Sequence, residues 1–418
     1  MAGGYASNPA FVLKNEKNKS KFSFDSFLCI IKFVSMSLRC GLSMATTTFF
    51  EASITRTWNG KQTAHCSPAL FESYANIIQQ RQHERLEKLA FSRMLGVGGQ
   101  GVVYLTHRQG TDEFELPIAV KIFSPERFNG EEPYNKAMRL LAQVSSRVSK
   151  IQHNNLLDVL NWIETNGIRM MEMEYIDGFD LNELFRNEML DHIRQRVNDR
   201  EWHHLREVIV THGHSHPRLK PGIAIAITQE CLSALGALHR EGIVHGDIKP
   251  SNIMLKRTGN AKIIDLGSAY EIANPPDRTT CTPLYAAPEV LAGEKPTPLS
   301  DLASLGYLVV EMLSGVVPFD PRANYKDLLE AKQFLAQKLP NFLPAEVVSN
   351  ELLMNFCRKL VASDPAKRFP SAESANYLHG GAVSFQRQLV RGNLASSFDN
   401  DIRFWLSLLE NYEPDKKS

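Results

Sequence analysis

Two kinds of sequence pattern follow one another along this chain, and their order constrains the fold most strongly. Short segments rich in β-branched and aromatic residues fill residues 89–176, with one helical pattern between Pro133 and Ile151. These strand-like segments are AFSRMLGV, GVVYLTH, LPIAVKIF, NLLDVLNWIE and GIRMMEMEY. Long helical patterns dominate from Pro221 onward, such as PLSDLASLGYLVVEMLSG, which closes at Gly315. The sequence therefore predicts a small strand-rich lobe and then a larger helical lobe, with ligands binding between them.

The composition is that of an ordinary globular chain. Its 418 residues are 43% hydrophobic and 22% charged, which is enough to bury a large core. The formal net charge of +1 gives no electrostatic case for nucleic acid or an anionic membrane, so neither partner is expected. The six cysteines include no CxxC pair, which argues against a zinc site or a disulfide framework. This cysteine usage favours a reducing, cytoplasmic location.

Residues 1–66 are expected to form a poorly ordered leader. Its apolar run, Phe27 to Leu38, follows a basic segment and in this respect is similar to a signal peptide or a membrane anchor. The run is too short to span a bilayer and carries Lys32 in its middle, which argues against both interpretations. A true start at Met36 or Met44 is a further alternative.

Helical patterns flank the main domain on both sides. Ser67 to Leu89 has helical spacing, so residues 67–88 are predicted to be a helical N-terminal extension. Residues 379–418 are predicted to be a C-terminal helical extension. Its apolar residues at helical spacing are Phe398, Ile402, Trp405, Leu406 and Leu409. Packing of this helix on the domain is the simpler interpretation, and docking of another protein is the alternative.

A glycine-rich turn, LGVGGQGVVY, places Gly96, Gly98 and Gly101 between two strands. A dinucleotide-binding unit would need a helix after the turn and an acidic residue ending the next strand, and the sequence fits neither. Because glycine has no side chain, the backbone amides of such a hairpin can approach phosphate oxygens closely. A flexible hairpin without a ligand is the alternative interpretation.

Lys121 lies on the next predicted strand, in IAVK between apolar neighbours. Side chains alternate along a strand, so this lysine can point toward the glycine turn and place its ammonium on a phosphate. A surface lysine is the alternative, which the spacing after the hairpin disfavours.

The loop HGDIKPSNIML holds an acid, a base and an amide, Asp247, Lys249 and Asn252, between two apolar stretches. IIDLG at 263–267 and APE at 287–289 follow it. In this order after the glycine hairpin and IAVK, the motifs resemble the signature set of eukaryotic-type protein serine/threonine kinases. The resemblance covers roughly residues 89–378. It implies an α+β, bilobal protein-kinase-like fold with a small β-rich N-lobe at about 89–176 and a larger α-helical C-lobe at about 177–378.

The resemblance implies that ATP and Mg²⁺ bind this chain. Asp247 would accept the proton of the substrate hydroxyl and Lys249 would neutralise charge on the γ-phosphoryl group. Asn252 and Asp265 would ligate Mg²⁺. Thr282, in CTPLYAAPE, matches the threonine that contacts the catalytic acid and lysine in serine/threonine kinases. The implied nucleotide-binding residues are Gly96, Gly98, Gly101, Val103, Ala119, Lys121, Met173, Glu174 and Ile176.

Other matched positions imply architecture. Glu289 and Arg368 match a buried ion pair at the end of the activation segment, and losing one partner of such a pair is costly. Asp301 would anchor the catalytic loop by accepting backbone hydrogen bonds. Residues 174–176 would form the hinge, with Met173 at the back of the adenine pocket; ordinary strand core is the alternative for the methionines of MMEMEY.

The helix after Lys121 departs from the family pattern. Kinases of this family pair the strand lysine with a glutamate on that helix, and no acid occurs between Pro133 and Ile151. Val144 occupies the expected place, and Gln143 beside it is a candidate hydrogen-bond partner for Lys121. Glu131 and Glu132 stand near the helix start. This absence predicts that transfer is retained but weakened.

Two more departures concern the activation segment. Gly246 stands where many kinases have an arginine that binds a phosphorylated residue of this segment. Phosphorylation at Thr279 or Thr280 would thus find no evident local charge, and activity is expected not to depend on it. Cys281 replaces a more common glycine, and a buried thiol is the simpler interpretation, with a reactive thiol as the alternative.

An insertion of about residues 186–220 follows DLNELF. It contains several histidines, at 203, 204, 212, 214 and 216, which could bind a transition metal, although a polar surface excursion is the simpler interpretation. The insertion could also dock a partner protein.

The sequence therefore predicts an ATP- and Mg-dependent protein kinase acting on Ser/Thr hydroxyls of protein substrates, of the type without the arginine before Asp247. A nucleotide-binding pseudokinase scaffold is the main alternative, because the helix glutamate is missing. A small-molecule phosphotransferase is a weaker one, because APE and the Thr282 segment are features of protein-substrate enzymes.

Overall fold

The computed structural model describes residues 56–57, 67–80, 82–83, 86–277, 280–391 and 397–412, which all belong to one compact unit, Phe50–Ser418. The predicted leader lies outside the described residues except for the two-residue strand β1, Arg56–Thr57. This strand pairs antiparallel with β15, Thr280–Cys281.

The first lobe is built on an antiparallel sheet with the strand order β2-β3-β4-β5-β7-β6. The strands are β2 (Gln82–His83), β3 (Leu86–Gly98), β4 (Gly101–Gln109), β5 (Glu115–Phe123), β6 (Val159–Thr165) and β7 (Ile168–Glu174). Each strand-like segment of the sequence contributes one of β3 to β7. Buried side chains of β5 and β7, such as Val120 and Met170, form the core of this lobe.

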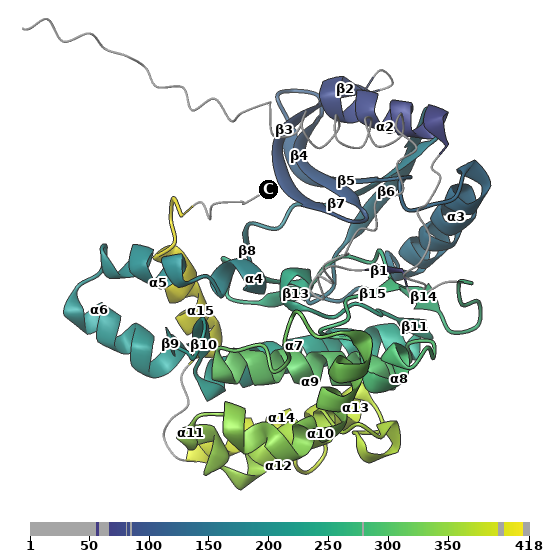
Figure 1. Ribbon diagram of the computed structural model, residues 1–418. Helices are drawn as coiled ribbons and strands as arrows, with labels where there is room; N and C mark the ends of the chain where they lie inside the picture. Colours follow the sequence, from purple (N-terminus) through teal and green to yellow (C-terminus); the bar gives the residue numbers. More distant parts are fainter. Residues whose placement is uncertain are drawn as a thin grey trace, which may run out of the picture. The chain divides into compact units, whose positions relative to one another are not determined.

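Two helices accompany the sheet, as Figure 1 shows. Helix α2 (Pro68–Gln80) packs on it through Leu70 and Ile77, which are buried in the same core. The helix ends at Gln80, and Leu86 already begins a strand, so the helical extension is shorter than the predicted 67–88. Helix α3 (Glu131–Val148) is the helix expected between Pro133 and Ile151.

The second lobe is helical, as the sequence predicts. Its centre is formed by α7 (Pro221–Arg240) and α9 (Pro298–Ser314), which pack against each other. Around them lie α4 (Leu181–Leu184), α8 (Pro288–Leu291), α10 (Tyr325–Phe342), α11 (Ala345–Val348), α12 (Glu351–Leu360), α13 (Ala372–Tyr377) and α14 (Ala382–Arg391). Helix α7 is long and apolar enough to cross a bilayer, but most of its side chains are buried inside this lobe.

Local sequence explains the ends of helix α9. The Thr297 side chain accepts the backbone N–H of Ser300 in a capping box, and Pro298 occupies the first turn, where its missing N–H costs nothing. Gly315 ends the helix with φ +70°, a left-handed conformation that favours glycine. Asp301, one turn into the helix, is thereby fixed beneath the loop that precedes β12.

Short strands carry the loops of the candidate site. β8 (Gly178–Asp180), β12 (Ile253–Lys256) and β13 (Ala261–Ile263) form a three-stranded sheet. β11 (Ile243–Val244) pairs with β14 (Tyr270–Glu271). The loop HGDIKPSN therefore runs between β11 and β12, and DLG follows β13.

The insertion and the tail pack on one another beside α7. The insertion comprises α5 (Asn187–Arg194), α6 (Asp199–His204), a π-helical turn η1 (Leu205–Ile209), β9 (Val210–His212) and β10 (Pro217–Leu219). Its apolar side chains, including Met189, Ile193 and Leu219, are fully buried in the core of the helical lobe. The insertion is therefore a polar surface excursion only in part: His203, His204, His212 and His214 are exposed, while one face of the insertion belongs to the core.

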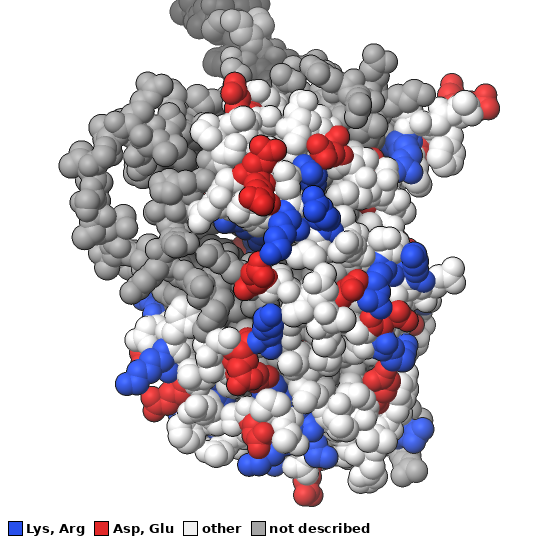
Figure 2. Space-filling view, turned by 90° about the vertical axis from the view of Figure 1, so that its right-hand side faces the viewer, with Lys and Arg blue, Asp and Glu red and all other residues white. Residues whose placement is uncertain are grey.

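Charge is mixed over the surface. Figure 2 shows lysine and arginine interspersed with aspartate and glutamate over the visible described face, without one large area of a single sign. This distribution agrees with the formal net charge of +1.

Candidate active site

The glycine-rich turn joins β3 to β4 as a hairpin, as predicted. Gly98 pairs with Gly101, and Gly99 and Gln100 form the tip between them. Gly101 has φ +140°, and a Cβ there would lie 1.9 Å from the carbonyl oxygen of Ile122, so no side chain fits. The backbone of the turn can therefore lie close to β5, which carries Lys121.

Lys121 is buried, with 5% of its surface exposed, and lies opposite Val103 on β4 and Met171 on β7. Its Nζ contacts Asp265 Oδ1 over 2.5 Å and donates to Gln100 Oε1 over 2.8 Å. Burial lowers the pKa of the Lys121 ammonium, and the Asp265 carboxylate partly offsets this. The alternative of a surface lysine is excluded, because the side chain points inward and connects the two lobes.

Asp265 follows β13 with φ +65°, an uncommon conformation for a residue other than glycine. Its Oδ1 accepts hydrogen bonds from Lys121 and from the backbone N–H of Gly267, over 2.8 Å for the latter. Burial alone would raise the pKa of Asp265, but the Lys121 ammonium and these hydrogen bonds hold it well below its ordinary value. The side chain is therefore a carboxylate at neutral pH.

Asp247 is the centre of the second cluster and is 5% exposed. Its Oδ1 accepts from both the hydroxyl and the backbone N–H of Thr282, over 2.6 Å and 3.0 Å. Lys249 Nζ lies 2.8 Å from Asp247 Oδ2 and donates to the Thr282 hydroxyl over 3.0 Å. Thr282, 35 positions further along the chain, therefore contacts both Asp247 and Lys249.

Asn252 closes this loop. Its Nδ2 donates to the backbone oxygen of Asp247 over 2.8 Å. This bond fixes the amide orientation and leaves the amide oxygen as the acceptor atom of the side chain. An amide oxygen from Asn252 and a carboxylate from Asp265 are the hard ligands that Mg²⁺ prefers, when nucleotide phosphates and water complete the shell. The donor set therefore fits a magnesium ion held largely by a bound nucleotide.

Asp301 anchors the loop from below, as predicted. Its two carboxylate oxygens accept the backbone N–H groups of His245 and Gly246, each over 2.9 Å, and His239 Nε2 lies 2.9 Å from Oδ2. Asp301 is 1% exposed, so its carboxylate has lost its hydrogen bonds to water, and these bonds from the protein replace them.

The positions of the predicted adenine pocket lie on β5 and at the end of β7. Ala119 pairs with Met173, and both are buried. Glu174 ends the strand: its side chain accepts the backbone N–H of Asp158 and pairs with Lys262. Ile176, two residues further on, is buried in the core of the first lobe.

The helix residues proposed for Lys121 do not reach it. Gln143 is exposed on α3, and the side-chain hydrogen bonds that the structure gives for Lys121 go to Gln100 and Asp265 instead. Val144 is 3% exposed and packs in the core. Glu131 and Glu132 lie in the first turn of α3. The hypothesis of a Gln143 partner is therefore wrong.

Gln100 contacts Lys121 but was not predicted as a site residue from the sequence. The only signal was its position, a polar residue at the tip of a turn otherwise made of glycines. Its side chain could equally have pointed to solvent, so sequence alone did not distinguish the two arrangements.

Arg368 and Glu289 form the predicted buried ion pair. Arg368 Nη1 and Nη2 donate to the two carboxylate oxygens of Glu289 over 2.6 Å and 2.8 Å. The guanidinium also donates to backbone oxygens of Ala362, Leu299 and Ser363. This bidentate pair fixes the end of the activation segment to the helical lobe.

The other two departures lie in the loop before β12 and in the activation segment that follows DLG. Gly246, in that loop, has φ +76°, a left-handed conformation that favours glycine. The Thr280 hydroxyl is 2.7 Å from the Ser268 hydroxyl, while Thr279 lies outside the described residues. Cys281 is 4% exposed, and burial raises its pKa to about 12, so the thiol is protonated at neutral pH. This confirms the interpretation of Cys281 as a buried thiol.

Two of the predicted histidines of the insertion, His204 and His216, have separate partners. His204 Nε2 lies 3.3 Å from Asp401 of α15 (Phe398–Ser407), and His216 stacks on Phe185 and faces Glu311. Within the described ranges, no group of three or more His, Cys, Asp or Glu side chains could hold a metal ion. The metal-site alternative therefore has no support in the described part of the insertion.

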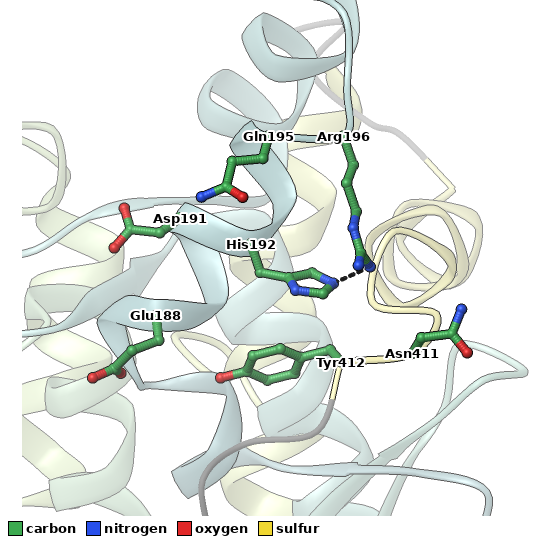
Figure 3. A pocket seen from close by; sticks show the side chains of 7 residues that line it. All are labelled: Glu188, Asp191, His192, Gln195, Arg196, Asn411 and Tyr412. Atoms are coloured by element: carbon green, nitrogen blue, oxygen red, sulfur yellow. Dashed lines mark hydrogen bonds between the residues drawn. The ribbon is translucent and has the colours of Figure 1, made fainter. Parts of the chain in front are cut away.

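Helix α5 and the tail line a shallow surface hollow, shown in Figure 3. His192 contacts Arg196 and packs edge-on against Tyr412, and Arg196 donates to the backbone oxygen of Glu410. The apolar side chains of α15, such as Trp405 and Leu406, are buried. The tail therefore packs on its own domain, which was the simpler of the two interpretations.

A strand lysine beneath a glycine hairpin, a carboxylate on each of two loops and an amide oxygen define a phosphoryl-transfer site as a class. A family model of the protein kinase domain matches residues 89–378. The chain therefore belongs to the protein kinase family, which confirms the resemblance and the predicted bilobal fold.

Curated relatives carry the same assignment in their names. The chain is 28% identical over 285 residues to the serine/threonine-protein kinase PrkC of Bacillus subtilis, covering 67% of this chain and 38% of that protein. It is 27% identical over 329 residues to the serine/threonine-protein kinase STE20 of Candida glabrata, covering 73% and 31%. For the serine/threonine-protein kinase PknD of Mycobacterium tuberculosis, the identity is 27% over 286 residues, covering 67% and 37%. The chain thus spans about a third of the length of these relatives.

Proposed function

We propose that this chain is a protein kinase that transfers the γ-phosphoryl group of ATP to serine and threonine hydroxyls of protein substrates. One observation carries the proposal: the Asp247 carboxylate is held by Thr282 and Lys249 on the loop that also carries Asn252. Kinases named as serine/threonine-specific among the relatives support the choice of acceptor.

The chemistry asks for positioning and charge neutralisation more than for covalent catalysis. Thr282 binds Asp247 Oδ1, and the other oxygen, Oδ2, contacts Lys249 and Asn252. Oδ2 would orient a substrate hydroxyl and accept its proton. Lys249, 2.8 Å from that oxygen, supplies positive charge where charge develops on the transferred group. Thr282 holds both side chains in place through its hydroxyl.

Asn252 and Asp265 would hold Mg²⁺ together with the nucleotide phosphates. A bound Mg²⁺ would neutralise negative charge on the β- and γ-phosphates. Lys121 would bind phosphate oxygens beneath the glycine turn, and Val103, Ala119 and Met173 would flank the adenine. This set of residues gives the proposed nucleotide site.

We further propose that activity does not depend on phosphorylation of the activation segment. Gly246 offers no cation to a phosphate, and the Thr280 hydroxyl is engaged with Ser268. Treatment with a protein phosphatase should leave the rate of transfer within about twofold of the untreated rate. A phosphorylated residue bound by a cation would contribute one or more charge-assisted hydrogen bonds, and its dephosphorylation would lower the rate more. Strong inactivation by the phosphatase would contradict this.

The missing helix glutamate should weaken phosphoryl transfer. It should not abolish transfer, because Lys121, Asp247, Asn252 and Asp265 are all present. The pseudokinase scaffold is the second candidate, and it rests on that same absence. Helix α15 buries its apolar face in its own domain, which leaves the exposed polar face of the insertion as the candidate surface for docking a partner of such a scaffold.

Incubation with radiolabelled ATP, Mg²⁺ and dephosphorylated casein separates the candidates. The wild type should label serine and threonine, and Asp247→Ala and Asp265→Ala should each abolish labelling. A scaffold would bind nucleotide without any labelling, and transfer to small molecules alone would indicate a different phosphotransferase. Labelling that survives Asp247→Ala would contradict the proposed role of Asp247.

We also propose a cytoplasmic location, because Cys231, Cys281 and Cys357 are free thiols. Fractionation of cells that express a tagged chain tests this, and recovery in a secreted or membrane fraction would contradict it.

A further inference from the structure

Lys121 lacks the partner that its helix would ordinarily supply. Val144 is buried at the position where the family pattern has a glutamate, and Gln143 next to it is exposed. A buried ammonium has lost its hydrogen bonds to water and needs acceptors within the protein. Its one carboxylate partner, Asp265, would also have to ligate Mg²⁺. A second acceptor for Lys121 is therefore to be expected elsewhere in the fold.

The glycine hairpin supplies this acceptor. Gln100 is 6% exposed, although it stands at the tip of a turn, and its Oε1 accepts from Lys121 Nζ over 2.8 Å. Its Nε2 donates to the Ser268 hydroxyl, immediately after DLG, over 3.3 Å. One side chain therefore joins the turn, the strand lysine and the start of the activation segment.

We propose that Gln100 is the positioning residue for Lys121 and replaces the missing helix glutamate. The inference rests on the proposed function, since it explains how the lysine meets the phosphates of a nucleotide.

The direction of the amide supports this assignment. Glutamine has an acceptor end and a donor end, and the Ser268 hydroxyl accepts from the donor end. The acceptor end is thereby turned toward the ammonium. An ammonium has three N–H donors, and Gln100 and Asp265 use two of them, which leaves one for a phosphate oxygen.

Close packing fixes the same arrangement. A Cβ on Gly267 would lie 1.6 Å from Gln100 Oε1, so the amide occupies the space that a side chain at 267 would fill. A neutral amide holds the lysine without adding a second negative charge beside Asp265. Residue 100 therefore places no negative charge beside Asp265, the carboxylate that would bind Mg²⁺.

Steady-state kinetics with ATP and dephosphorylated casein test the proposal. Gln100→Met keeps the chain length and removes the acceptor, and should lower kcat/KM for ATP about ten- to a hundredfold, as expected for a hydrogen bond to a charged group. KM for casein should stay unchanged. Gln100→Glu restores an acceptor for Lys121 but adds a second negative charge beside Asp265, so it should recover only part of the loss. Gln109→Met is the matched control, since Gln109 is exposed on β4 and bonds only the neighbouring Glu115 side chain among the contacts described.

A second readout does not need transfer. In an Asp247→Asn background, the probe is an ATP derivative with an acyl group bonded to its γ-phosphate. The Lys121 amine should attack the acyl carbon, ATP leaves, and the amine loses a proton to solvent. Peptide mass spectrometry gives the rate at a saturating concentration of this probe. Gln100→Met should slow acylation about tenfold or more, in line with its kinetic effect. Ser268→Ala, which removes the partner of the amide nitrogen, should slow it in the same direction by a smaller factor. This variant also carries the test if Gln100→Met does not fold.

Several results would overturn the assignment. Gln100→Met with the acylation rate of the parent protein would show that the amide does not position Lys121. A lower KM for ATP in Gln100→Met would show that Gln100 obstructs the nucleotide instead. Failure of Lys121 to acylate in the parent would show that the ammonium does not meet the phosphates. Transfer that survives Asp247→Asn would count against the proposed function alone, because acylation of Lys121 does not require Asp247.

Discussion

Thr282 and Asp247, 35 positions apart in the chain, share a pair of hydrogen bonds to one oxygen: the hydroxyl and the backbone N–H of Thr282 both donate to Asp247 Oδ1. The activation segment thus fixes the rotamer of the proposed base. Oδ2 of the same carboxylate faces Lys249.

Removal of the Thr282 hydroxyl should therefore impair catalysis. Thr282→Val keeps the backbone bond and the shape of the side chain, and should lower kcat about tenfold, the effect of one hydrogen bond to a charged group. Thr282→Ser, which keeps the hydroxyl, is the matched control and should stay within about threefold of the wild type. Steady-state measurement of kcat checks both. Equal rates for Thr282→Val and the wild type would mean that the hydroxyl does not hold Asp247 during turnover.

The Arg368 and Glu289 pair predicts an asymmetry in stability. Arg368→Met leaves the buried Glu289 carboxylate unpaired and should lower the free energy of unfolding by about 3 to 5 kcal/mol. Changing both residues to methionine should cost less than Arg368→Met alone, because no unpaired charge remains. Arg194→Met, which breaks an exposed pair with Asp199, should cost less than about 1 kcal/mol. Urea denaturation measures all three, and a double variant that costs as much as Arg368→Met or more would argue against this account of the pair.

Lys332 predicts a dependence of stability on pH. Its ammonium is fully buried between the rings of Tyr307 and Phe319, at 4.0 Å and 3.8 Å from their centroids, and donates to the backbone oxygen of Leu284. Burial lowers the pKa of Lys332 well below its ordinary value. The unfolded chain therefore binds a proton that the folded chain does not, in the interval between the folded pKa and the ordinary lysine pKa, and the free energy of unfolding should rise with pH there.

Lys332→Met should reduce this rise in the pH range just below the ordinary lysine pKa of about 10.4. Urea denaturation at a series of pH values measures the slope for both proteins. A slope that is the same in both would show that Lys332 does not titrate differently on folding.

Cys281 should be chemically inert in the folded protein. Its pKa of about 12 leaves roughly a thousandth of the thiolate that a cysteine of ordinary pKa has, and the side chain is buried as well. Iodoacetamide at pH 8 should modify Cys281 only after unfolding, as peptide mass spectrometry can show. Rapid modification of the native protein would instead favour the reactive-thiol alternative.

Much of the fold followed from local patterns. The strands of the first lobe and helices α7 and α9 were predicted because their periods of two and 3.6 residues, and end signals such as Gly315, act over a few residues. Helix α2 is shorter than its pattern suggested. Its apolar spacing continues past Gln80, but Gln82–His83 and the residues from Leu86 onward join the sheet. Strand pairing is a tertiary contact that local spacing does not report.

The residues of the candidate site that lie in short sequence motifs could be predicted. Asp247, Asn252, Asp265 and Lys121 were named from short segments, because each segment must present one particular chemical group. The partner of Lys121 was not predictable, because it depends on how the tip of the glycine turn folds over Gly267. The insertion was judged by its polar residues, while its buried face depends on contacts with helices far away in the sequence.

Calorimetric titration with ATP tests most directly whether Asn252, Asp265 and Lys121 form one site for a nucleotide and Mg²⁺. The wild type should bind ATP at least about tenfold more tightly with Mg²⁺ than with EDTA, since the ion is held jointly by these oxygen ligands and the phosphates. Asp265→Ala should lose this dependence on Mg²⁺, while Asp247→Ala should still bind. No nucleotide uptake by the wild type, or an Asp265→Ala variant with unchanged magnesium dependence, would contradict the account.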